Sequence, residues 1–240
     1  MTTLCNNLEN VHQRIAQACT DAGRDAAGVA LLAVSKTFGA DAVLAAAEAG
    51  QRAFGENYVQ EGIDKIAALR ALGWAQLQWH CIGPLQSNKT RPVAEHFDWV
   101  HTVDRLKIAE RLSAQRPAHL PPLQVCLQLN VDGGANKAGV APADALALAR
   151  AVAQLPRLVL RGVMSIPEPA VGLEAQRALH LRAKAVFDAI AAAGGAGLEY
   201  FDTLSLGMTG DLEAAVAAGS TMVRVGSGIF GGRGAVGAAG

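Results

Sequence analysis

Mostly apolar runs alternate with helix-like segments along almost the whole chain, and this alternation constrains the fold more than any other feature. Eight runs have the length and composition of buried strands: residues 29–35, 52–55, 78–82, 99–103, 124–131, 158–166, 203–206 and 222–225. Between them lie segments with helical periodicity: residues 40–50, 59–72, 88–96, 104–115 with Asp104 as the cap, 142–154, 173–193 and 210–218. Strands separated in this way pair in parallel, because each connection must cross over the sheet.

About eight β/α units in a chain of 240 residues predict an α/β fold, a single (β/α)8 TIM barrel. An extra helix precedes the first strand, since apolar residues recur at helical spacing over residues 4–22. A doubly wound open sheet is the alternative, but no G-x-G-x-x-G motif follows the first strand. We expect the barrel to occupy residues 1–232 and the Gly/Ala-rich residues 233–240 to form a disordered tail.

The composition argues against several classes of protein. Lys plus Arg equals Asp plus Glu, at 21 each, which gives no support for a nucleic-acid partner. The sequence contains no run of about eighteen apolar residues, so we expect no membrane span, and no secretory signal is apparent. The four cysteines form no C-x-x-C pair, so we expect no metal site, and together with the missing signal they indicate reduced thiols in a cytoplasmic protein. We also expect a monomer.

Lys36 stands at the end of the first apolar run, where a barrel places its reactive groups. A lysine whose ammonium is partly removed from water loses its proton more readily and becomes a nucleophile for aldehydes. A lone lysine in this position is more often a side chain that reaches solvent. The end of the chain shifts this balance.

The last two strands are followed by segments that suit a phosphate group. Residues 205–210 read Ser-Leu-Gly-Met-Thr-Gly before a helix, and residues 226–228 read Gly-Ser-Gly after the final strand. Glycines and hydroxyls at these places let backbone N–H groups converge on an anion, although the same residues are common in ordinary turns. With Lys36 on strand 1 and Arg224 on strand 8, a phosphorylated aldehyde could bridge the groups, and pyridoxal 5'-phosphate (PLP) is the leading candidate.

Six stretches in this order resemble the YggS/PROSC family of pyridoxal-phosphate homeostasis proteins. They are residues 33–36 (Ala-Val-Ser-Lys), 54–61 (Phe-Gly-Glu-Asn-Tyr-Val-Gln-Glu), 80–89 (His-Cys-Ile-Gly-Pro-Leu-Gln-Ser-Asn-Lys), 161–164 (Arg-Gly-Val-Met), 204–212 (Leu-Ser-Leu-Gly-Met-Thr-Gly-Asp-Leu) and 219–226 (Gly-Ser-Thr-Met-Val-Arg-Val-Gly). The resemblance covers about residues 5 to 232 and implies the fold-type III barrel of the alanine racemase N-terminal domain.

The resemblance also implies a role for each site residue. Lys36 would hold PLP as a Schiff base, and Arg224 would face the pyridine nitrogen. The phosphate would be bound by Ser205, Thr209, Gly226 and Ser227, and the pocket would include Asn57, His80 and Met164. The chain departs from the family pattern at Asn136-Lys137-Ala138-Gly139, at Ser165 and at Thr209, which leaves any role of Lys137 or Ser165 open.

By this resemblance the chain is a carrier and regulator of intracellular PLP, not an enzyme, with apo PLP-dependent enzymes as recipients. A weakly active amino-acid racemase is the alternative. Alanine racemase uses a second base, a tyrosine from another domain, and neither Tyr58, expected in the core or at the pocket rim, nor Tyr200 matches it. A Schiff-base aldolase is a third possibility, but no carboxylate is clearly paired with Lys36. We expect His180 and three other histidines, His12, His96 and His119, at the surface.

Overall fold

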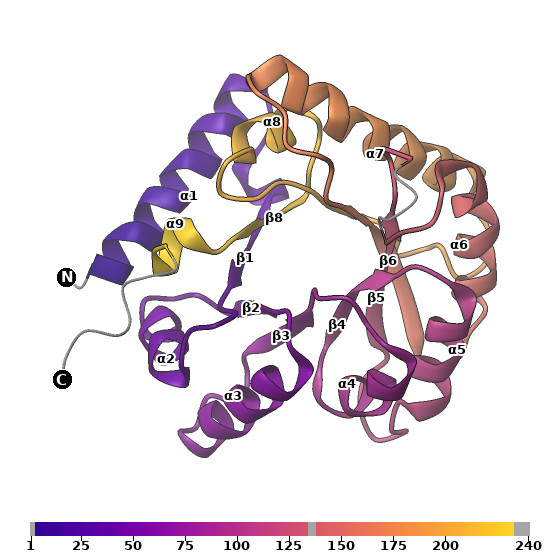
Figure 1. Ribbon diagram of the computed structural model, residues 1–240, viewed down its shortest axis with the longest axis horizontal. Coiled ribbons are helices and arrows are strands. Elements are labelled where there is room, and N and C mark those ends of the chain that lie inside the picture. The colour runs from indigo at the N-terminus through magenta and orange to yellow at the C-terminus, as the bar shows by residue number, and fades with distance from the viewer. Residues whose placement is uncertain (1–2, 134–137, 233–240) are drawn as a thin grey trace.

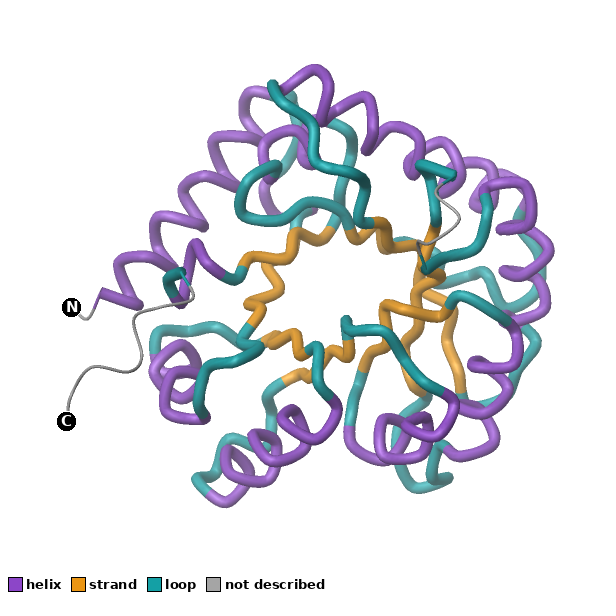
Figure 2. The backbone as a smooth tube through the Cα atoms, in the orientation of Figure 1, coloured by secondary structure: helices purple, strands orange, loops and turns teal. Residues whose placement is uncertain are grey.

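The computed structural model describes residues 3–133 and 138–232, and its centre is a closed barrel of parallel strands in the order β1 to β8 (Figures 1 and 2). The strands are β1 Ala30–Val34, β2 Ala53–Glu56, β3 Gln78–Cys81, β4 Trp99–Val103, β5 Leu123–Leu129, β6 Leu158–Ser165, β7 Thr203–Ser205 and β8 Met222–Val225. Pairing of β1 with β8 closes the sheet, which confirms the predicted barrel and excludes the open doubly wound sheet.

Helices surround the barrel on its outer side (Figure 1). They are α1 Thr3–Asp21, α2 Ala40–Glu48, α3 Val59–Ala71, α4 Thr90–His96, α5 Leu106–Gln115, α6 Ala145–Ala153, α7 Leu173–Ala193, α8 Leu212–Ala217 and α9 Ser227–Phe230. Short 3-10 turns occupy Ala26–Gly28, Ser87–Lys89 and Pro142–Asp144, and the last two open the predicted helices 88–96 and 142–154. The sequence did not predict α9, the short helix after β8.

The predicted cap of α5 is wrong. The helix begins at Leu106 with Arg105 as its N-cap, and no side chain caps it. The Asp104 carboxylate instead pairs with the Arg105 guanidinium, 2.8 Å away. The Asp104 carboxylate is therefore paired with Arg105 and does not accept a hydrogen bond from the first N–H groups of α5.

The extra helix α1 packs on the outside of the barrel against α8 and α9, near the β1–β8 pair that closes the sheet. Its apolar stripe, Leu8, Val11, Ile15 and Ala18, is buried, as the helical spacing predicts. The helix lies against α8 and α9, so the first and last parts of the described chain pack together (Figure 1). In the described part of the chain, no helix is both long and apolar enough to cross a bilayer.

Apolar side chains fill the layer between strands and helices, whereas the inside of the barrel carries polar groups. His80, His101, Ser205 and Arg224 are all buried on β3, β4, β7 and β8. A buried polar group costs stability unless it is hydrogen-bonded, so these side chains must satisfy one another.

Candidate functional site

A cavity of about 500 Å³ opens at the carboxyl ends of the strands. Six of the nine residues predicted from the sequence line it: Lys36, Asn57, Thr209, Arg224, Gly226 and Ser227. They come from the ends of β1, β2, β7 and β8, which meet at one mouth because all the strands are parallel. The barrel therefore brings the candidate lysine, the candidate phosphate loops and the arginine to one place.

Lys36 lies in the turn that follows β1 and is only partly buried. The expectation that it belongs to the buried strand is therefore not met, because β1 ends at Val34 and the chain turns outward after Ser35. The turn still directs this residue to the cavity wall, together with Thr37 and Phe38.

The two loops that follow β7 and β8 are joined by hydroxyl groups. The Ser227 hydroxyl donates to Thr209 Oγ1 at 3.2 Å, and the backbone N–H of Gly228 donates to the same oxygen at 3.4 Å. Ser227 and Gly228 open α9, and the first N–H groups of a helix have no partner within it. Beside them, a Cβ on Gly226 would lie 3.2 Å from the Val34 carbonyl oxygen, so a side chain there would press against β1. The arrangement provides N–H and O–H donors for an anion.

Arg224, on β8, lines the same cavity as Thr209 and Ser227, the two hydroxyl residues of this donor cup, and it is almost fully buried. Its Nη1 donates to the backbone oxygen of Ser205 at 2.7 Å and to Ser205 Oγ at 2.8 Å, and Nη2 donates to the Ser165 oxygen at 3.0 Å. Burial lowers the pKa of Arg224 to about 10, so the guanidinium remains a cation at neutral pH. These three acceptors are uncharged, and the positive charge at the cavity is therefore not neutralised by a direct ion pair.

A chain of hydrogen bonds continues from Arg224 through the inside of the barrel. His101 Nδ1 lies 3.1 Å from Ser205 Oγ, His101 Nε2 lies 2.9 Å from His80 Nδ1, and His80 Nε2 lies 3.0 Å from Gln78 Oε1. Burial lowers the pKa of His80 to about 3 and that of His101 well below its usual value, so both rings are neutral. With the Gln78 oxygen as the terminal acceptor, each ring carries its proton on Nε2 and Ser205 donates to His101. Every donor in the chain then points away from Arg224.

Three of the predicted site residues lie below the cavity instead of lining it. The Ser205 hydroxyl is fully buried and bonded to Arg224 and His101, and Ser205 does not line the cavity. His80 and Met164 are also fully buried, the first in the chain just described and the second against Trp99 and Cys126. These side chains point into the barrel from within the strands, whereas the cavity is lined by the turns beyond the strand ends and by Arg224.

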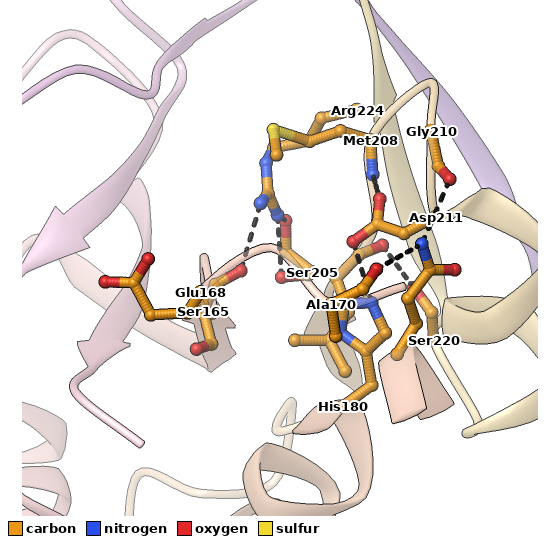
Figure 3. A network of polar contacts seen from close by, with 12 residues as sticks. Ser165, Glu168, Ala170, His180, Ser205, Met208, Gly210, Asp211, Ser220 and Arg224 are labelled. Carbon is orange, nitrogen blue, oxygen red and sulfur yellow. Dashed lines mark hydrogen bonds and ion pairs between the residues drawn. The ribbon is translucent and has the colours of Figure 1, made fainter. Parts of the chain in front are cut away.

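The loop after β7 is anchored by an aspartate whose partners the sequence did not reveal. Asp211 Oδ1 accepts the Met208 N–H at 2.6 Å, and Oδ2 lies 3.0 Å from His180 Nε2 (Figure 3). Burial pushes the pKa of Asp211 up, but the bonds from His180 and from the Met208 N–H outweigh it and leave this pKa below its usual value. The prediction of an exposed His180 is wrong, because α7 turns this ring inward and leaves it 1% exposed.

The N-terminal helix also reaches the cup. Arg14 Nη2 donates to the Thr209 backbone oxygen at 3.0 Å, and its guanidinium forms a two-pronged pair with Glu213 at 2.8 and 2.9 Å. Nothing in the local sequence of α1 signals this contact, because the partners are about two hundred positions away. Lys137, whose role the family pattern left open, and the predicted tail at 233–240 lie outside the described residues.

Comparison with known proteins identifies the family of this chain. A family model described as the N-terminal domain of alanine racemase matches residues 7–234. The pyridoxal phosphate homeostasis protein of Pseudomonas aeruginosa is 56% identical over 233 residues, which are 97% of this chain and 97% of that one. The chain belongs to the family of pyridoxal phosphate homeostasis proteins.

Other members of the family support this assignment. The protein of that name from Escherichia coli K12 is 53% identical over 237 residues, covering 97% of this chain and 98% of the relative. PipY of Synechococcus elongatus has been solved without PLP, with a TM-score of 0.83, 37% identity and coverage of 95% and 100%. It has also been solved with PLP bound, with a TM-score of 0.78, 38% identity and coverage of 90% and 100%.

Proposed function

We propose that this protein binds PLP in the cavity at the carboxyl ends of its strands and acts in PLP homeostasis as a carrier and regulator. The observation that carries the proposal is that one cavity is lined by Lys36, by the donor-rich cup of Thr209 and Ser227, and by Arg224. The relatives named for PLP homeostasis and the PLP-bound structure of PipY support it.

The residues present fit the cofactor group by group. The hydroxyls of Thr209 and Ser227 and the first N–H groups of α9 suit a phosphate dianion. The Arg224 guanidinium suits the lone pair of a pyridine nitrogen, and Lys36 would hold the aldehyde covalently, with loss of one water. Asn57 would close the side of the pocket after β2. When bound, PLP supplies an electrophilic aldehyde and a ring that can withdraw electrons.

The surroundings of Arg224 favour storage over catalysis. A cation beside a pyridine nitrogen disfavours protonation of that nitrogen, and an unprotonated ring withdraws electrons poorly. Ser205 accepts a bond from Arg224 and directs its own hydroxyl proton to His101, and both His101 and His80 are neutral, so these groups offer the arginine side of the cavity no ready proton. We therefore propose that this protein is not an enzyme.

Racemase and aldolase chemistry receive less support from the same cavity. Tyr58 and Tyr200, the only tyrosines of the chain, are 60% and 64% exposed and do not line it, so the expectation that Tyr58 is core or pocket rim is not met. Glu56 and Glu61, two carboxylates that bond to the Lys36 turn, are also bonded to Lys65 and do not line the cavity. We propose apo PLP-dependent enzymes of the cytoplasm as the recipients of the cofactor.

The test is the visible absorbance spectrum of the purified protein after incubation with PLP, before and after borohydride. We expect a band that borohydride fixes covalently to the protein, that Lys36→Ala abolishes and that Lys107→Ala, at an exposed position on α5, retains. A wild-type protein that stays colourless and cannot be loaded with PLP would overturn the proposed function. A band of wild-type intensity in Lys36→Ala would move the covalent link to another residue.

A further inference from the structure

The turn that carries Lys36 has an unusual backbone conformation. Thr37, the next residue, has a φ of 69°, in the left-handed region that glycine adopts freely and threonine does not. A β-branched residue there costs free energy and persists only when the surrounding structure holds it. The contacts that hold Thr37 therefore bear on the position of Lys36.

Three charged side chains supply those contacts, and we call them the Lys65 cluster: Glu56 at the end of β2, and Glu61 and Lys65 on α3. Lys65 Nζ donates to Glu56 Oε1 at 2.7 Å and to Glu61 Oε1 at 2.6 Å. Its third bond, at 2.8 Å, goes to the backbone oxygen of Ser35, the residue before Lys36. An amine nitrogen of this kind has three donors as an ammonium, and three acceptors engage Lys65 Nζ, so Lys65 is held in place within the cluster and does not line the cavity.

The two carboxylates hold the turn on both sides of Lys36. Glu56 Oε1 accepts the Ser35 hydroxyl at 2.6 Å, and Glu61 Oε1 accepts the Thr37 backbone N–H at 2.6 Å. The Ser35 N–H donates in addition to the Gly55 oxygen of β2 at 3.1 Å. With its neighbours bonded in this way, Lys36 has a fixed backbone, and the side chain is the part left free to react.

The cluster contributes little net stability to the fold, because its charges are buried. Glu56 is fully buried and Lys65 is 5% exposed, and taking such a pair out of water costs much of what its attraction returns. Within the described part of the chain, the second Glu56 oxygen, Oε2, is buried without a hydrogen-bond partner. Apolar side chains in these positions would avoid both the desolvation of the ion pair and the unpartnered Glu56 oxygen. The hydrogen bonds from the cluster to the Lys36 turn therefore point to a role other than stability.

We propose that Glu56, Glu61 and Lys65 are positioning residues that hold the Ser35–Thr37 turn, with Thr37 in the left-handed region, and so aim Lys36 into the cavity. The inference rests on the proposed function, because it assumes that Lys36 captures the PLP aldehyde. It makes the rate and strength of capture depend on residues that do not line the cavity.

The variant that tests this is Glu61→Ala, because Glu61 is the partly exposed member, with 28% of its side chain accessible, and its loss should leave the fold intact. We expect PLP capture, followed by absorbance, to weaken on the order of tenfold, since the strained turn loses a stabilising bond. Glu61→Gln keeps an oxygen for the Thr37 N–H and should stay close to wild type. Glu61→Ala with Thr37→Gly should recover most of the loss, because glycine adopts the positive φ without strain.

The control is Asp64→Ala, which removes a carboxylate one turn along the same helix, from an exposed position bonded to Gln60. It should bind PLP as the wild type does. Hydrogen exchange at the Thr37 amide of the PLP-free protein gives a readout independent of the cofactor, and it should speed up in Glu61→Ala and return in Glu61→Gln.

Two results would overturn the inference while leaving the proposed function standing. One is a Glu61→Ala protein that captures PLP as fast and as tightly as the wild type. The other is a loss that Thr37→Gly does not restore, because the defect would then lie outside the turn. A wild-type protein that never captures PLP contradicts the proposed function instead.

Discussion

At the scale of single residues, environment separates side chains that look alike in the sequence. Lys36 lies in the turn after β1 and Lys65 bonds to that turn from α3, yet the first lines the cavity and the second is buried against two carboxylates. His80 and His101 are bonded to each other inside the barrel, where burial keeps both rings neutral. Their chemistry follows from position and not from residue type.

The neutral histidine pair predicts how stability depends on pH. An unfolded histidine takes up a proton near pH 6.5, whereas the folded pKa of His80 is about 3 and that of His101 is also strongly lowered. As pH falls below about 6.5 the unfolded state binds more protons, so the free energy of unfolding falls by up to about 1.4 kcal/mol per pH unit for each buried ring.

Urea denaturation between about pH 7.5 and 5 measures this slope. His101→Gln should make the slope shallower, and His12→Gln, at an exposed position of α1, serves as the matched control. A free energy of unfolding that stays constant or rises as pH falls through this window would contradict the burial of the pair in neutral form.

At the scale of elements, the pairing of β6 with β7 positions the two residues that accept hydrogen bonds from Arg224. Gly162 lies opposite Thr203 in the register, and a Cβ at Gly162 would overlap the Thr203 carbonyl. The close approach of these strands fixes Ser165 and Ser205, the two residues that accept bonds from Arg224.

Gly162→Ala should therefore lower the free energy of unfolding by about 2 kcal/mol or more, because the strands must separate to admit the methyl group. Urea denaturation at neutral pH checks this. Gly28→Ala is the control, since a Cβ at Gly28 meets nothing within 4 Å. Equal stability of the two variants would show that the β6–β7 contact can widen freely.

At the scale of the whole molecule, closure of the barrel brings the two ends of the described chain together at the cofactor cup. Arg14 of α1 bonds to the Thr209 oxygen and to Glu213 in the first turn of α8 (Figure 1 shows the two helices side by side). The N-terminal helix therefore supports the loop that is proposed to hold the phosphate.

Arg14→Met should weaken PLP binding about 1.4- to fivefold, because partly exposed ion pairs of this kind contribute about 0.2–1 kcal/mol. Titration of the protein with PLP, followed by absorbance, measures the change. Arg91→Met, which removes an exposed arginine paired with Glu95 on α4, should bind as the wild type does. A matching loss in both variants would mean that general charge, and not the contact with Thr209, supports the cup.

Local sequence determined the elements and their order. Alternation of apolar runs with helical periodicity requires parallel strands with crossover helices, and enough such units close into a barrel. Because the carboxyl ends of parallel strands lie at one end of the barrel, the sequence alone predicts that Lys36, Thr209, Arg224 and Ser227 lie together, and all four line the cavity. Those inferences need only periodicity and chain direction.

Side-chain direction and long-range contact were decided by the tertiary structure alone. Ser205, His80 and Met164 were expected at the pocket, but they point into the barrel below it, and a short strand does not reveal in advance which face it turns inward. Lys65, Arg14 and His180 each bond to residues outside their own helix, and for Arg14 these lie about two hundred positions away. Such contacts leave no periodic signal in the chain, because they exist only after closure brings distant segments within hydrogen-bond distance.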